Sequence, residues 1–71
     1  MEIFYTQHIL ERMEQRGISK DILQYTWTHG LHSTDEEWKV TVTHTHKDKN
    51  IKIIAKKKGK HFILVTSYYY D

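Results

Sequence analysis

The sequence contains no cysteine and no proline, and only 3 of its 71 residues are glycine. Without cysteine, disulfide bonds, thiolate metal ligands and thiol catalysis are excluded. No apolar run approaches the roughly 20 residues that cross a bilayer, and the N-terminus lacks the apolar core of a signal peptide. We therefore expect a cytoplasmic protein without membrane contact. Because domains run roughly 50–200 residues, residues 1–71 should form a single domain.

An excess of charge of one sign is also missing, since 11 Lys+Arg oppose 9 Asp+Glu for a formal net charge of +2. The charges are nevertheless separated along the chain. Acidic residues gather before residue 38, whereas residues 47–60 contain seven lysines and a single acid, Asp48. These lysines are Lys47, Lys49, Lys52, Lys56, Lys57, Lys58 and Lys60. Such a cluster either protects strand edges or contacts the phosphates of RNA.

The first part of the chain has the pattern of two helices. Thr6 is a suitable N-cap for a helix over residues 7–16 that stops at Gly17, and Ser19 caps a second helix that stops at Gly30. Apolar residues form one face of the first helix. A second stripe, with the helical spacing i, i+4, i+8, contains His8, Arg12 and Arg16.

After Gly30 the pattern becomes that of strands. Residues 31–37 read as a polar loop. Three segments that alternate or are rich in β-branched and aromatic residues follow, over 38–46, 51–55 and 61–70. Short turns over 47–50 and 56–60 predict an antiparallel meander. The predicted fold class is α+β, with two N-terminal helices packed on a three-stranded antiparallel sheet or on a four-stranded one.

The stripe of His8, Arg12 and Arg16 combines a proton carrier with two cations. Cleavage of RNA without a metal needs one group to take the 2′-hydroxyl proton, another to protonate the leaving 5′-oxygen, and fixed cations to hold the phosphorane oxygens. Imidazole, with an ordinary pKa of about 6.5, suits proton transfer, and the guanidinium fork suits phosphate. The alternative is a solvated helix face on which Glu11 and Glu14 pair with the arginines.

Hydroxyl groups gather at the end of the last strand. There Thr66 and Tyr68 could orient a phosphate or stack on a base. The ordinary preference of threonine and tyrosine for strands explains the same residues. If RNA binds beside the lysines, Trp38 and Tyr69 are further candidates for stacking.

Four histidines have spacings that zinc can use: His29, His32, His44 and His46. No cysteine joins them, and ordinary loop and strand positions account for them, so no metal or other cofactor is expected. His44 or His46 would instead supply a second catalytic imidazole if its strand face met the first helix.

Residues 6–19, TQHILERMEQRGIS, resemble the opening of domain-of-unknown-function family 4258, which reads approximately H-x-x-x-R-x-x-x-R-G-I-S/T. Residues 64–68 resemble the V-T-x-Y-like end of that family's last strand. The family is similar to the barnase–EndoU–colicin–RelE group of ribonuclease folds, many of which are toxins. The resemblance implies a RelE-like arrangement of helices on an antiparallel sheet, with RNA cleaved without metal.

The resemblance implies a role for each matching residue. His8 would be the general acid or base, Arg12 and Arg16 would hold the scissile phosphate, and Thr66 and Tyr68 would orient it. Arg16 adjoins Gly17, where its cation could instead cap carbonyls.

The leading hypothesis is a small metal-independent endoribonuclease. It would be the toxin of a toxin–antitoxin system, with RNA and a cognate antitoxin as partners and homodimerisation left open. The alternatives are a non-catalytic RNA- or protein-binding module of the same fold, and a zinc protein that uses the histidines.

Overall fold

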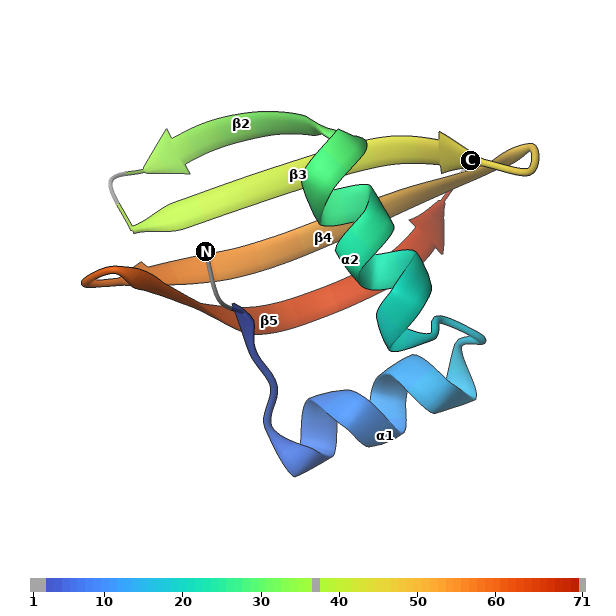
Figure 1. Cartoon of the computed structure of the whole chain (residues 1–71), viewed down its shortest axis with the longest axis horizontal. Coiled ribbons are helices and arrows are strands. Elements are labelled where there is room, and N and C mark those ends of the chain that lie inside the picture. Colours follow the sequence, from blue (N-terminus) through green and yellow to red (C-terminus); the bar gives the residue numbers. More distant parts are fainter. Residues whose placement is uncertain (1–2, 37, 71) are drawn as a thin grey trace.

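The computed structural model places two helices on one side of a five-stranded sheet (Figure 1). It describes residues 3–36 and 38–70, except for the side chains of residues 35, 36 and 46. The elements in chain order are β1 (Ile3–Phe4), α1 (Gln7–Gln15), α2 (Lys20–His29), β2 (Leu31–Glu36), β3 (Lys39–His46), β4 (Lys49–Lys58) and β5 (His61–Tyr70). Neither of the two described helices is long and apolar enough to cross a membrane.

Both helices begin at the predicted caps. The Thr6 hydroxyl accepts a hydrogen bond from the Ile9 amide at 3.2 Å, and the Ser19 hydroxyl accepts one from the Ile22 amide at the same distance. These bonds satisfy backbone donors that have no partner within the helix.

The end of α1 is a Schellman motif. The Ile18 amide donates to the Met13 carbonyl at 2.9 Å, and the Gly17 amide donates to the Glu14 carbonyl at 3.1 Å. Gly17 has a φ of 73°, in the left-handed region that this motif requires. The motif buries Ile18, which is 2% exposed, and turns the chain sharply from α1 into α2.

The connection from α2 to β2 packs directly on β3. A Cβ atom at Gly30 would lie 2.5 Å from the Thr26 carbonyl oxygen and 2.6 Å from Cγ1 of Val42. Only glycine leaves room for this approach. The predicted stop of the second helix is therefore confirmed, and close packing is its reason.

The sheet has the order β1-β5-β4-β3-β2, so the predicted three or four strands are too few. The antiparallel meander of β3, β4 and β5 is confirmed. The segment predicted as a polar loop, residues 31–37, contains the whole of β2, an edge strand whose residues show no apolar alternation. β1 pairs parallel with β5, which makes the sheet mixed. Its two residues are too few to form a pattern.

The strands also extend further into the turns than predicted. β4 continues through Lys58, so the connections shrink to residues 47–48 and 59–60. Lys47 and Asp48 both have positive φ, 49° and 66°. Two positive φ angles are typical of the tight type I′ hairpin, whose twist matches that of the flanking strands.

The core lies on the face of the sheet that bears the helices. Cross-strand pairs such as Val42↔Ile53 and Ile53↔Ser67 show that every buried strand side chain points to that face. These side chains are Val40, Val42, Ile51, Ile53, Ala55, Leu64 and Ser67. We call the opposite face, which carries Lys52, Ile54 and Tyr68 and on which neither described helix lies, the open face.

Candidate functional site

β5 changes its neighbours halfway along its length. Phe62 and Ile63 pair with both β1 and β4, whereas the described part of β5 from Val65 onward pairs only with β4. A bulge marks the change, because Ala55 opposes Leu64 while Ile54 opposes Thr66, which leaves Val65 as the extra residue. Bulges redirect the side chains around them. Beyond the bulge, β5 therefore has a free backbone edge, and α1 lies against this part of the strand.

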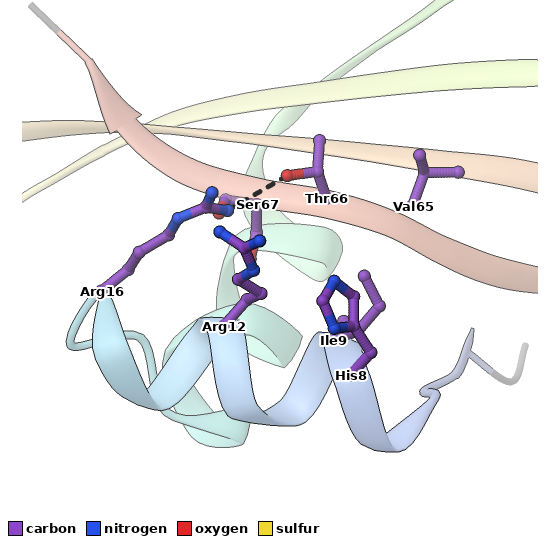
Figure 2. A pocket seen from close by; sticks show the side chains of 7 residues that line it. All are labelled: His8, Ile9, Arg12, Arg16, Val65, Thr66 and Ser67. Carbon is purple, nitrogen blue, oxygen red and sulfur yellow. Dashed lines mark hydrogen bonds between the residues drawn. The ribbon is translucent and has the colours of Figure 1, made fainter.

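A groove of about 250 Å³ lies between α1 and this free edge (Figure 2). We call it the edge groove. It is lined by His8, Ile9, Arg12, Arg16, Val65, Thr66 and Ser67. Figure 2 shows the polar side chains of α1 in a row that faces β5. Four of the five residues predicted to be catalytic are therefore brought together, namely His8, Arg12, Arg16 and Thr66.

Arg16 joins the helix to the strand. Its Nη1 donates to the Ser67 carbonyl at 2.9 Å and to the Thr66 hydroxyl at 3.2 Å. The carbonyl lies in the part of β5 that lacks a second neighbouring strand, so the guanidinium replaces a strand donor there. The structural role considered for Arg16 is thus observed, although it caps a strand carbonyl rather than the end of its own helix.

Arg12 lies one helical turn before Arg16 and points into the same groove (Figure 2). Within residues 3–36 and 38–70, neither Glu11 nor Glu14 forms an ion pair with it. His8, Arg12 and Arg16 are all exposed, as in the solvated helix face considered from the sequence, but without the ion pairs to Glu11 and Glu14. Two guanidinium groups, a hydroxyl and an imidazole line a space large enough for a phosphate group, which makes the edge groove a candidate anion site.

Tyr68 does not reach the edge groove. Side chains alternate along a strand, and both of its neighbours face the helices: Ser67 is 2% exposed, and the Tyr69 hydroxyl donates to the Gly17 carbonyl at 3.4 Å. Tyr68 pairs with Lys52 on the open face. The predicted grouping of Tyr68 with His8 is therefore not found, because the sheet separates them.

The lysines predicted to bind RNA do not form one patch. Lys47 and Lys60 lie in hairpin turns at opposite ends of the sheet (Figure 1). On the helix-bearing face, the Lys49 ammonium lies 5.2 Å from the Tyr69 ring centroid, and Lys57 lines an aromatic pocket. Strand alternation places the rest on the open face: Lys52, Lys56 and Lys58.

The aromatic pocket was not foreseen from the sequence. Its volume is about 480 Å³, and it unites side chains from α2, β2, β3, β4 and β5. The Trp27 and Phe62 rings meet edge-on in its wall, with centroids 4.9 Å apart. Because its residues are distant from one another in the sequence, no local sequence pattern indicates that they form one pocket. Trp38, predicted to stack on RNA, is 46% exposed just before β3 and does not line this pocket.

The histidines predicted as alternative zinc ligands engage aromatic rings. The His29 and His44 rings lie 4.3 and 5.7 Å from the Tyr25 ring, and His32 lies 5.2 Å from Trp27, each measured between centroids. In the part of the chain that the structure describes, which excludes the side chain of His46, no group of three or more metal-ligating residues could hold an ion. His44 meets α2 rather than α1, so it does not join His8.

Comparison with known proteins adds a family. A family model described as a domain of unknown function, DUF4258, matches residues 5–69. This range includes the α1 motif, the meander and the bulged part of β5. Neither a curated protein nor a solved structure matches the chain. Since the family model covers nearly the whole sequence, the chain belongs to the DUF4258 family.

Proposed function

We propose that this DUF4258 domain is a metal-independent endoribonuclease of toxin type, with the edge groove as its active site. One observation carries the proposal: His8, Arg12 and Arg16 face the free edge of β5 in one row and, with Thr66, line a groove large enough for a phosphate group. An imidazole beside two guanidinium groups supplies both proton transfer and charge stabilisation. The proposal includes the resemblance inferred from the sequence between this family and the RelE group of ribonuclease folds, which would imply the same chemistry.

In the proposed reaction the 2′-oxygen of RNA attacks the adjacent phosphorus, and the bond from phosphorus to the 5′-oxygen breaks. The products are a 2′,3′-cyclic phosphate and a 5′-hydroxyl. His8 transfers one of the two protons, as base toward the 2′-hydroxyl or as acid toward the leaving oxygen, and water exchanges the other. The phosphorane carries one negative charge more than the phosphodiester, so two fixed cations bind it more tightly than the substrate.

The two arginines have different parts in this scheme. Arg16 is anchored to β5 through Nη1, and the rest of its guanidinium remains to donate to a phosphate oxygen. None of the described residues anchors Arg12 in this way, and Arg12 supplies the second cation. The hydrogen bonds of Arg16 position the phosphate, and both cations stabilise the charge of the transition state.

As a toxin, the protein would act in the cytoplasm and have a cognate antitoxin that covers the edge groove. Its expression should arrest growth unless the antitoxin is present. Arg12→Ala should abolish the arrest, because without the second cation the groove no longer holds the transition state.

The enzyme is tested by incubating the purified protein with total RNA in excess EDTA. We expect cleavage that falls at least about 100-fold in His8→Ala and in Arg12→Ala. Glu11→Ala, an exposed neighbour on α1 that does not line the groove, is the matched control and should cleave normally. Circular dichroism confirms that each variant is folded. Absence of cleavage of tRNA, mRNA and ribosome-bound RNA by the wild type, or equal cleavage by all variants, would contradict the proposal.

A second candidate is a non-catalytic RNA-binding module. Three observations favour it: Arg16 is partly committed to β5, Tyr68 lies on the open face, and His8 is the only imidazole that lines the described groove. Such a module would bind RNA with an affinity that depends on Arg12 and would show no turnover.

A further inference from the structure

The open face carries positively charged lysines, which suit the binding of a polyanion. β3, β4 and β5 contain no aspartate or glutamate, although they supply most of the sheet. Lys52 and Lys56 project from the open face, and Ile54 lies between them. The described helices cover only the other face. A partner with many negative charges would therefore meet lysines and no acidic side chain on these three strands.

Two tyrosines accompany these lysines. Tyr68 is the cross-strand partner of Lys52, and the Lys52 ammonium lies 5.2 Å from the ring centroid of Tyr70. Tyr70 is 37% exposed. The exposed Tyr70 ring thus lies beside a cation, and the half-buried Tyr68 lies opposite the same lysine in the strand register. An aromatic plane for a base beside an ammonium for its phosphate is the usual means of binding single-stranded nucleic acid.

The tyrosines are also continuous with the edge groove. Thr66, Tyr68 and Tyr70 oppose Ile54, Lys52 and Asn50 in turn, so they form one row along β5. Residues two apart on a strand are separated by about 6.6 Å. The row begins at Thr66, whose hydroxyl accepts the hydrogen bond from Arg16 in the groove. A nucleic acid strand that leaves the groove along β5 would therefore pass Tyr68 and then Tyr70.

We infer that single-stranded RNA crosses the edge of β5, with one phosphate in the edge groove and the neighbouring bases stacked on Tyr68 and Tyr70. The position of the phosphate rests on the proposed function, whereas the stacking surface rests on the open face alone. Paired bases in a duplex already stack on one another and present only their edges. The substrate class is therefore single-stranded RNA.

Binding can be measured apart from cleavage. The probe is a fluorescent single-stranded oligonucleotide with 2′-O-methyl riboses, which lacks the attacking hydroxyl, and its anisotropy is followed in EDTA. We expect Tyr68→Ala and Tyr70→Ala each to weaken binding about 5- to 100-fold, because each removes one stacking plane. Tyr68→Phe and Tyr70→Phe keep the plane and should bind like the wild type. Tyr25→Ala, an exposed tyrosine on α2, is the matched control and should also bind normally.

The outcomes separate this inference from the proposed enzyme. Full affinity in both alanine variants would overturn the stacking surface, even if His8→Ala abolishes cleavage. Lost affinity in those variants would support the surface, even if no protein cleaves RNA. Equal affinity for the single strand and its duplex would contradict the substrate class. A wild type without affinity for RNA would overturn the inference and leave the open face to a protein partner.

Discussion

The two faces of the sheet use the same strands for different purposes. On the helix-bearing face, Val42, Ile51 and Ile53 are fully buried against the helices. On the open face, their neighbours along the strands are threonine, asparagine, lysine and isoleucine side chains that keep part of their surface in water. Because side chains alternate along a strand, the residues on one face stabilise the fold, and those on the other face remain available to a ligand. The edge groove lies at the edge of β5, between α1 and the bulge.

This division follows from the placement of the helices. The two described helices lie on one face of the sheet, and neither lies on the other. We therefore expect substitutions on the helix-bearing face to change the free energy of unfolding, and those at the groove or on the open face to change interactions with RNA.

Adjacent isoleucines on β4 give the sharpest contrast. Ile53→Ala removes a fully buried side chain and should lower the free energy of unfolding by about 2–5 kcal/mol. Ile54→Ala, on the open face, should lower it by less than about 1 kcal/mol, since its site is already partly hydrated. Urea unfolding followed by circular dichroism measures both. Similar losses in the two variants would refute the division between the faces.

A methyl group at Gly30 should disturb the helix-bearing face. Gly30→Ala brings Cβ within 2.6 Å of atoms in α2 and β3 and should cost about 3 kcal/mol, because a backbone carbonyl cannot move aside easily. Gly59→Ala is the matched control, since its Cβ meets open space and only the positive φ of 63° opposes it, at about 1 kcal/mol. Thermal unfolding ranks the two variants, and the reverse ranking would show that the α2–β2 connection is not close-packed.

Substitutions of the two groove arginines should have different effects on stability and on RNA binding. Arg16→Ala removes two hydrogen bonds to the free edge of β5 and should lower the free energy of unfolding by about 1–2 kcal/mol. Arg12→Ala breaks no such bond and should change it by less than about 0.5 kcal/mol while still weakening RNA binding. Urea unfolding measures the stability of both variants, and the fluorescence anisotropy of a labelled RNA measures their binding on the same samples. Equal stability losses would mean that Arg12 is also structural.

The smallest expected effect is a pH dependence from Tyr5. Burial raises the pKa of its phenol above the ordinary value of 10.0, and the Gln24 side chain offsets part of this increase. The folded state then holds the proton more tightly than the unfolded state does. The free energy of unfolding should fall as the pH rises from about 10 through the folded-state pKa. Tyr5→Phe should remove this part of the alkaline slope in urea titrations, and an unchanged slope would refute it.

Local signals made the helices predictable. The caps at Thr6 and Ser19 and the stop at Gly17 each depend on a few neighbouring residues, so the sequence alone locates them. β2 has a polar composition because it is an edge strand, and β1 exists only through its pairing with a distant segment. Neither strand has a pattern of its own, which explains why the predicted sheet was too small.

The site was predictable to the same extent. Helical spacing is sufficient to place His8, Arg12 and Arg16 on one stripe. The bulge at Val65 and the free edge beyond it depend on where β1 ends, and no local pattern shows this. Thr66 lies beside Arg16, whereas Tyr68, two residues further along β5, lies on the open face, and no local pattern separates the two.

The most direct test of the central claim is the chemistry of the cut ends. RNA cleaved by the wild type in EDTA should carry 2′,3′-cyclic phosphates and 5′-hydroxyls, and a substrate with 2′-deoxyribose at the cleavage site should stay intact. His8→Ala should leave both substrates uncut. Products with 3′-hydroxyl and 5′-phosphate ends, or cleavage of the deoxy-substituted substrate, would contradict proton transfer by His8 at a phosphate held in the edge groove.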